Sequence, residues 1–339
     1  MATFLVTGGC GFIGSHLVDL LVRQGHRVRV LDNLSSGRTH NVAPEAELMI
    51  GDVADAAIVA LAMKGVTGCF HLAAQAGLQA SAEDWLGSHR TNLTGTLTVF
   101  DTARSRAVPV AYASSAAVYG DSADQRLSEM APTKPLSAYG ADKLGCEAHG
   151  RVAASLHGVP NAGLRIFNVY GPRQDPASIQ AGVISIFTAR IMEGEPMPVH
   201  GDGEQTRDFI FVADVAAHLV AAMDRLLERQ RDGKAAASAV FNVCTGQATR
   251  IRDLAALIAR LSGRPLRQQS MPARPGDIRR SLGDPSAAIR HLRIAATTAL
   301  EDGLRQTLSR LQPPTPTDIP GLEPVTPFGV HWSSRLLSQ

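Results

Sequence analysis

The stretch FLVTGGCGFIGSHLVDLLVRQGHRVRVLDNLSSG, from Phe4 to Gly37, decides the fold. A short apolar run leads into glycines at positions 8, 11 and 14, a helical pattern follows, and a second apolar run ends in an aspartate. Gly8 can take the positive φ of a tight turn, Gly11 lets a pyrophosphate approach the backbone, and Gly14 lets the helix pack closely on the strand. The free N–H groups at the start of the helix then face the phosphates. The stretch therefore predicts a dinucleotide-binding strand, turn and helix.

The aspartate that ends the second apolar run, Asp32, indicates which dinucleotide binds. A carboxylate there accepts hydrogen bonds from the hydroxyls of an adenosine ribose and repels a 2′-phosphate, so we expect NAD rather than NADP. Farther along, the segment GDV at 51–53 places Asp52 near the adenine amino group. The segment HLAA at 71–74 has small residues where the cofactor would run along the sheet edge.

The order of elements predicts the fold class. Short β-rich runs such as RVRVLDN, TGCFHLA and VPVAYASS alternate with helical patterns, as in βαβ units on a parallel sheet. We predict an α/β protein: a Rossmann-type, doubly wound parallel sheet with a smaller C-terminal α/β lobe that binds substrate. The NAD-binding domain would cover 1–172 with returns to its sheet near 207–245, the lobe mainly 173–311, and a proline-rich tail 312–339, whose VHWSSRLL segment could dock as an arm.

Composition excludes several classes of protein. The 339 residues are 45% hydrophobic and 19% charged, and no apolar run reaches the roughly 18 residues of a membrane span. The net charge of +2 is too small to indicate nucleic acid or a membrane surface as a partner. The chain begins with no leader pattern, so we expect a cytoplasmic protein. The four cysteines, without CxxC or metal-ligand spacing, predict reduced, mostly buried thiols and no metal site.

Two stretches carry reactive groups. Ser115 follows the strand-like run VPVAYASS, and Tyr139 and Lys143 stand four apart in SAYGADKLGCE, on one face of a helix. A phenol normally ionises near pH 10, but an ammonium and a nicotinamide cation beside it both favour the phenolate. Tyr139 is therefore the expected general base, with Ser115 holding the same substrate oxygen.

Together these residues resemble the extended short-chain dehydrogenase/reductase superfamily, and within it the NAD-dependent nucleotide-sugar epimerases and dehydratases. The resemblance runs from Phe4 to about Leu311 and rests on TGGCGFIGSHL, LDNLSSG, HLAAQ, TNLTGT, SSAAVYG, YGADK, RIFNVYGPRQDP, GDGEQTRDFIFVADV and RPGDIRRSLGD. This series in this order is specific for the family.

The resemblance implies roles for individual residues. Those that would hold the cofactor are Gly8, Gly11, Phe12, Ile13 and Gly14 at the pyrophosphate, Asp32, Asn33, Ser35 and Gly37 at the ribose, Asp52 and Val53 at the adenine, and Leu72, Ala73, Ala74, Asn92, Tyr139, Lys143 and Phe167 along the remainder. Those that would hold the nucleotide sugar are Ser115, Asn168, Pro198, His200, Arg207, Arg274, Asp277 and Ser281. Guanidinium groups suit phosphate geometry, which supports the two arginines.

The two positions after the serine indicate the reaction. Family dehydratases carry an acidic pair there, whereas this chain has Ala116 and Ala117, which cannot transfer a proton. The resemblance therefore implies 4-epimerisation of a UDP-sugar, a UDP-hexose and/or a UDP-N-acetylhexosamine, through a transient 4-keto sugar. Tyr139 would take the 4-hydroxyl proton as hydride passes to NAD, and the hydride would return to the other face of the sugar.

Three alternatives remain open at this point. The chain could be a nucleotide-sugar reductase that releases its cofactor, or a dehydratase whose acid and base lie elsewhere. It could also be a non-catalytic protein that binds NAD or a nucleotide sugar. The intact Ser115, Tyr139 and Lys143 weigh against the last of these.

The resemblance carries two further expectations. Ser281, four residues beyond Asp277, stands at a position that walls the pocket beside the sugar 2-substituent. A tyrosine there would exclude an acetamido group, and serine leaves room for it. Family members commonly dimerise by pairing helices, so we expect a homodimer through 91–105 and the helix that holds Lys143.

Overall fold

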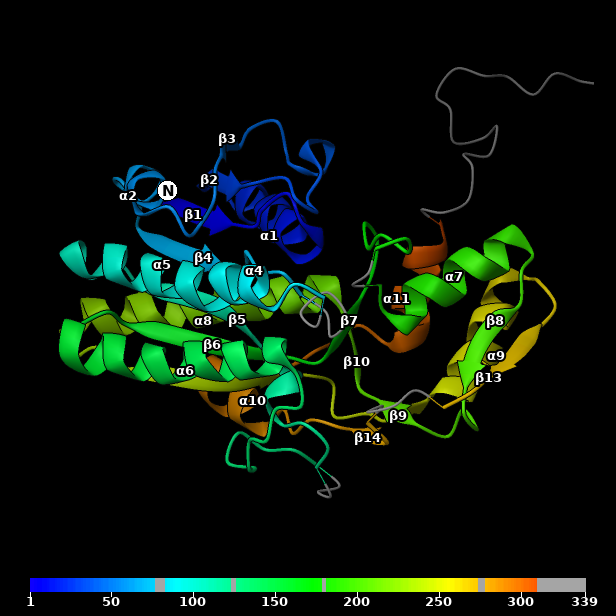
Figure 1. The fold of residues 1–339 in the computed structure, drawn as a ribbon. Coiled ribbons are helices and arrows are strands. Elements are labelled where there is room, and N and C mark those ends of the chain that lie inside the picture. Colours follow the sequence, from blue (N-terminus) through cyan, green and yellow to red (C-terminus); the bar gives the residue numbers. More distant parts are fainter. Residues whose placement is uncertain (77–82, 123–125, 179–180, 274–277, 310–339) are drawn as a thin grey trace, which may run out of the picture.

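A computed structural model describes residues 1–76, 83–122, 126–178, 181–273 and 278–309. Arg274, Asp277 and the proline-rich 312–339, with its VHWSSRLL segment, lie outside the described residues. Two layers of helices enclose a large sheet, and a smaller group of elements lies beside it, at the right in Figure 1.

The centre of the molecule is a parallel sheet. Its strands are β1 (Thr3–Thr7), β2 (Arg27–Asp32), β3 (Glu47–Ile50), β4 (Gly68–His71), β5 (Val110–Ser115), β6 (Asn161–Ile166) and β11 (Ser238–Val243). In the described chain the sheet has seven strands in the order β11-β6-β5-β4-β1-β2-β3. The order runs outward in both directions from β1 and β4, which places a topological switch point between them. The predicted doubly wound fold is confirmed.

Helices cover both faces of this sheet. One face packs against α1 (Phe12–Arg23), α8 (Val212–Arg231) and α10 (Ser286–Leu292), and the other against α2 (Ala56–Ala62), α5 (Gly95–Ala103) and α6 (Ala138–His157). The shorter helical segments are η1 (Thr39–Asn41), α4 (Trp85–His89), η2 (Arg90–Thr94), η3 (Arg104–Arg106) and η4 (Ala116–Val118). No helix in the described ranges is long and apolar enough to cross a membrane.

The smaller group of elements has its own apolar core. It contains α7 (Val183–Glu193), β8 (Met197–His200), α9 (Ile251–Ser262), β13 (Gln268–Met271) and α11 (Leu300–Ser309). Phe187, Leu254 and Leu304 meet in this core. Two small sheets lie between the group and the large sheet: β7 (Asn168–Tyr170) with β10 (Phe209–Phe211), and β9 (Thr206–Arg207) with β12 (Thr249–Arg250) and β14 (Arg280–Ser281).

The chain passes through this smaller group before it completes the large sheet. β11 lies beside β6, with Ser238 opposite Asn161 and Val243 opposite Ile166. Both α8 and β11 fall within the 207–245 return that the sequence predicts.

Local chemistry sets the bounds of α6, which carries two of the predicted catalytic residues. The Oγ of Ser137 accepts the N–H of Gly140 at 3.0 Å, so the helix begins at Ala138 and Tyr139 lies in its first turn. Gly158, with φ of +66°, ends the helix in the left-handed conformation that glycine adopts easily.

Candidate active site

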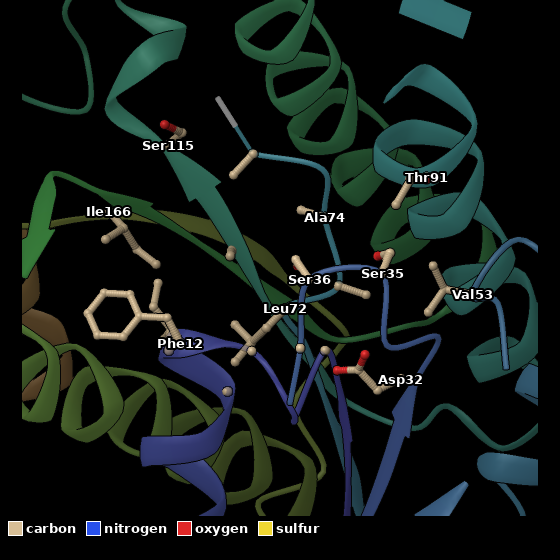
Figure 2. A pocket seen from close by; sticks show the side chains of 18 of the residues that line it. Phe12, Asp32, Ser35, Ser36, Val53, Leu72, Ala74, Thr91, Ser115 and Ile166 are labelled. Carbon is tan, nitrogen blue, oxygen red and sulfur yellow. The ribbon is translucent and has the colours of Figure 1, made fainter. Parts of the chain in front are cut away.

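A cavity of about 290 Å³ opens at the carboxyl ends of the central strands. Asp32, Val53 and Thr91 lie toward one end of it, and Ser115 and Ile166 lie toward the other (Figure 2). Of the predicted residues, those that line the cavity are Gly8, Gly11, Phe12, Ile13, Gly14, Asp32, Asn33, Ser35, Gly37, Val53, Leu72, Ala73, Ala74, Ser115, Tyr139, Lys143 and Phe167.

The glycine-rich turn packs too closely on its neighbours for side chains at Gly8 and Gly14. Gly8 has φ of +71°, and a Cβ on it would meet the Ala73 backbone at 2.7 Å. A Cβ on Gly14 would collide with the Gly8 carbonyl oxygen, so α1 packs directly on the turn. The N-cap of α1 is Gly11, and no side chain of the described residues caps the first turn by a hydrogen bond. The N–H groups of this turn are therefore available to an anion.

The Asp32 carboxylate shapes the next loop as well as the cavity. One oxygen accepts the Cys10 N–H at 2.9 Å and the other accepts the Leu34 N–H at 2.8 Å, while only 7% of the residue is exposed. Burial, with this carboxylate adding to it, raises the pKa of the Cys10 thiol to about 12. Each carboxylate oxygen keeps a further lone pair for a ligand hydroxyl.

A buried histidine, His71, which the sequence patterns did not indicate, supports the part of the cavity wall formed by Leu72 and Ala73. The His71 ring lies 2.7 Å from the Thr7 hydroxyl and 3.0 Å from the Thr96 hydroxyl. Burial, and secondarily the Lys143 ammonium, lower the pKa of His71 to about 3, so the ring is neutral. The Thr7 oxygen in turn accepts the N–H groups of Leu72 and Ala73. The imidazole thus fixes the backbone along which a cofactor would lie.

Ser115, Tyr139 and Lys143 meet at the other end of the cavity. What they share is that all three line the cavity. Ser115 ends β5, and its Oγ accepts the Ala117 N–H at 3.1 Å. Since that oxygen is engaged as an acceptor, the hydroxyl proton is left to donate to a group in the cavity. The Lys143 Nζ lies 5.8 Å from the centre of the Tyr139 ring, and Lys143 is 1% exposed. The arrangement can hold an oxygen, take its proton and surround it with positive charge.

Two of the predicted cofactor residues, Asp52 and Asn92, are not among the residues that line the cavity. Asn92 is fully buried, and its amide accepts the Gln75 N–H and donates to the Gln75 carbonyl. Asp52 accepts the Ala54 N–H and pairs with Arg90 at 2.5 Å. Neither side chain is among those that line the cavity, and each holds the backbone of a neighbouring segment, so contact of Asp52 and Asn92 with the cofactor stays a prediction.

Several predicted substrate residues lie outside this cavity, in the small sheets beside it. The Asn168 Nδ2 donates to the Asp208 carbonyl at 3.2 Å, and Arg207 donates to the Thr206 and Ile278 carbonyls. Ser281 on β14 lies opposite Arg207 on β9. Pro198 and His200 belong to β8, which pairs with β13. Arg274 and Asp277 lie outside the described residues.

A buried aspartate connects these small sheets to the large one. The Asp208 carboxylate accepts hydrogen bonds from the Thr245 N–H and hydroxyl and from the Gly246 and Gly283 N–H groups. Burial raises its pKa, and these hydrogen bonds oppose the rise. Because the Asp208 carbonyl also accepts a hydrogen bond from Asn168, Asp208 joins β7 to the segments that follow β11 and β14.

Several lining residues were not predicted from the sequence, among them Ser36, Thr91, Ser114, Ile166 and Gln174. Gln174 reaches the cavity from the loop after β7, and its Oε1 is buried without a hydrogen-bond partner among the described residues. The segment RIFNVYGPRQDP drew attention to this loop, but no spacing rule separates Gln174 from its neighbours. The four cysteines are buried free thiols, as predicted. No cluster of His, Cys, Asp or Glu that could hold a metal occurs among the described residues.

Comparisons with known proteins agree with this geometry. The UDP-glucose 4-epimerase of Mycolicibacterium smegmatis is 36% identical over 312 residues, which are 90% of this chain and 96% of that protein. The UDP-glucose 4-epimerase of Thermotoga maritima, solved with UDP-glucose, superposes with a TM-score of 0.85 at 33% identity, covering 91% of this chain and 98% of that chain. The UDP-N-acetylglucosamine 4-epimerase of Methanobrevibacter ruminantium, solved with UDP-N-acetylmuramic acid, gives 0.85 at 32% identity with the same coverage, 91% and 98%. Residues 4–244 match the model of one family, and the chain therefore belongs to the NAD dependent epimerase/dehydratase family.

Proposed function

We propose that the chain is an NAD-dependent 4-epimerase of UDP-sugars, acting on a UDP-hexose and/or a UDP-N-acetylhexosamine. One observation carries the proposal: Ser115, Tyr139 and Lys143 line the same cavity as a glycine-rich turn and the Asp32 carboxylate. The chain therefore holds a proton acceptor and a dinucleotide cradle in one continuous space.

The residues present fit NAD. The turn at Gly8 and Gly14 has no room for a Cβ, and the uncapped first turn of α1 offers N–H groups to a pyrophosphate. Asp32 would accept the ribose hydroxyls, and Lys143 would bond the nicotinamide ribose. When bound there, NAD accepts a hydride from the sugar and returns it. The other lining residues predicted from the sequence would shape the groove, and Asp52 and Asn92 would support it indirectly.

The chain's own side chains supply the proton transfers. Tyr139 as phenolate would take the proton of the sugar 4-hydroxyl. Ser115, whose Oγ accepts the Ala117 N–H, would keep its own proton and donate a hydrogen bond to the same sugar oxygen. Lys143, buried beside the ring, would stabilise the negative charge on the phenolate. After the 4-keto sugar turns over, the same tyrosine would return the proton. The configuration at C4 is inverted and nothing is consumed.

The neighbours of Ser115 disfavour the other reactions of the family. Ala116 and Ala117 begin η4 directly after the serine and offer neither acid nor base, so elimination lacks its proton transfers. A reductase would need NADH from outside at every turnover, whereas the relatives are named as epimerases.

The nucleotide part of the substrate is proposed to lie toward the small sheets. Asn168 and Arg207 would contact the diphosphate together with Arg274, and Pro198, His200 and Asp277 would hold the nucleoside. Ser281, 9% exposed and opposite Arg207, would face the sugar 2-substituent. We assign the substrate lobe to 173–311 and the NAD-binding domain to 1–172 with the 207–245 return.

The chain is further proposed to form a homodimer through α5 and α6. The outer face of α6 carries Val152, 41% exposed, and Leu156, 75% exposed, at i and i+4. A second copy covering this apolar stripe would account for it. Replacing both residues with glutamate should give a monomer in sedimentation equilibrium; an unchanged mass would remove this face from the interface. A cytoplasmic location stays a prediction.

A panel of UDP-sugars tests the activity. The purified protein should convert UDP-glucose or UDP-N-acetylglucosamine to a mixture with its C4 epimer, without net production of NADH, as read by nuclear magnetic resonance of the products. A dehydrated 4-keto-6-deoxy product, stoichiometric consumption of NADH, or no turnover of any UDP-sugar would each overturn the proposal.

A further inference from the structure

We propose that a buried ion pair, Arg165 with Glu147, together with Ser114, sets the position of the catalytic helix relative to the strand that carries Ser115. The inference rests on the proposed function, because it assigns these three as positioning residues for that reaction. None of the three was singled out by the sequence patterns.

The pair joins three elements of the site at one point. The Arg165 Nε and Nη2 donate to the two oxygens of Glu147 at 2.8 and 2.7 Å, and the Ser114 hydroxyl donates to Glu147 at 2.6 Å. Glu147 is on α6, Ser114 on β5 and Arg165 on β6. The three residues are 0, 2 and 5% exposed, and Ser114 also borders the cavity.

Each of these residues is next to a site residue along its own element. Glu147 lies one helical turn beyond Lys143 and two turns beyond Tyr139, on the same face of α6. Ser114 precedes Ser115. A displacement of Glu147 relative to Ser114 is therefore a displacement of Tyr139 relative to Ser115.

The third nitrogen of the Arg165 guanidinium, Nη1, connects the ion pair through Tyr119 to Phe167 in the cavity wall. The Arg165 Nη1 donates to the Tyr119 hydroxyl at 2.9 Å, and the guanidinium lies 4.8 Å from the centre of that ring. The Tyr119 hydroxyl donates to Asn242 on β11 at 2.6 Å, and its ring packs 6.2 Å from that of Phe167. Phe167 lines the cavity. The network thus joins the helix that carries Tyr139, the strand that carries Ser115, and Phe167 in the cavity wall.

Stability alone does not account for such a pair. Apolar residues of similar volume often hold a protein interior as well as a buried ion pair does, because both charges must be desolvated. The bidentate pair of hydrogen bonds between guanidinium and carboxylate also fixes their relative orientation. It therefore restricts both rotation and sliding of the helix. Directional control matters where reacting atoms must be aligned, and a misplacement of about 1 Å can cost about 100-fold in rate.

Two single variants test the inference. Arg165→Lys keeps the positive charge and removes the bidentate hydrogen bonding to Glu147. Ser114→Ala removes the hydrogen bond from Ser114 to Glu147 and leaves the ion pair intact. We expect kcat to fall about 10- to 100-fold in the first and about 3- to 10-fold in the second, with KM and bound NAD changed less than about twofold. Amides at 138–143 should exchange hydrogen faster in both variants.

The matched control is Tyr112→Phe. The Tyr112 hydroxyl is buried on β5 and has no hydrogen-bond partner in the described part of the chain. This variant should lose neither kcat nor amide protection at 138–143. If Arg165→Lys does not fold, the double variant Glu147→Leu with Arg165→Met removes both charges, and the same loss of kcat is expected from it.

The inference is overturned if Ser114→Ala and either folded variant of Arg165 keep kcat within twofold of the unmodified protein. It is also overturned if kcat and KM change together with bound NAD, as a general loosening would produce. Failure of the proposed function is a different result: the unmodified protein then converts no UDP-sugar, while hydrogen exchange at 138–143 still tests the network.

Discussion

Replacement of Asp32 by asparagine tests the cofactor assignment most directly. The carboxylate is 7% exposed, and each oxygen already accepts one backbone N–H, from Cys10 or Leu34. Asparagine keeps one carbonyl oxygen and so retains one of these two bonds, while the charge and the other acceptor are lost; alanine would lose both bonds. The variant therefore separates ligand recognition from folding better than alanine would.

The magnitude follows from the contacts. A hydrogen bond to a charged acceptor contributes about 1.5–3 kcal/mol, so losing one to the ribose should weaken NAD binding about 10- to 150-fold. A 2′-phosphate beside the carboxylate is repelled by about 4 kcal/mol per unit charge at 4 Å and an effective dielectric of about 20. NADP binding should therefore improve, and the preference for NAD should shrink by more than about 100-fold.

Isothermal titration of protein freed of cofactor measures both affinities. The control is Asp55→Asn, which removes the same charge from the N-cap of α2. It should leave the preference unchanged. The reasoning about the ribose site is refuted if the unmodified protein binds NAD and NADP equally, or if Asp32→Asn and Asp55→Asn show the same preference.

The other predictions concern the base, the sugar pocket and the buried imidazole. Tyr139→Phe should reduce kcat by at least about 1,000-fold and leave bound NAD in place, because the ring still packs without its proton acceptor; full turnover would remove Tyr139 from the mechanism. Ser281→Tyr should suppress turnover of UDP-N-acetylglucosamine about 10-fold more than that of UDP-glucose, and equal effects in paired assays would show that Ser281 does not wall the pocket. The pKa of His71 falls from 6.5 to about 3 on folding, so the unfolded chain binds the extra proton and stability declines as pH is lowered from about 6.5 toward 3. His71→Gln should reduce the slope of the unfolding free energy against pH by up to about 1.4 kcal/mol per pH unit, as measured by urea unfolding. An unchanged slope would show that His71 is not held neutral by burial.

The parts of the site that the sequence predicted are those whose geometry is local. The turn at Gly8, Gly11 and Gly14 and the pair Tyr139 and Lys143 each belong to one or two adjoining elements, so spacing alone indicates their geometry. The fold class followed from the alternation of strands and helices and is confirmed. The roles of the individual residues stay predictions.

The parts that were missed depend on partners far along the chain. The Asn92 amide is held at both ends by the backbone of Gln75, on another segment. Arg165 meets Glu147 only because β5 and β6 pair in one register and α6 lies across them. No periodicity in the sequence reports such a meeting, since it is decided by how the elements pack.

The late return of the chain to its sheet has a consequence for synthesis. β6 is buried along its whole length, and its outer neighbour β11 is translated only after β7 to β10 and α8. A nascent chain that has reached only Ile166 therefore presents the N–H and C=O groups of an apolar edge strand to its surroundings, and such an edge pairs readily with other chains. Expression of 1–172 alone would hold the protein at that stage, so the fragment should aggregate unless a strand equivalent to Ser238–Val243 is supplied.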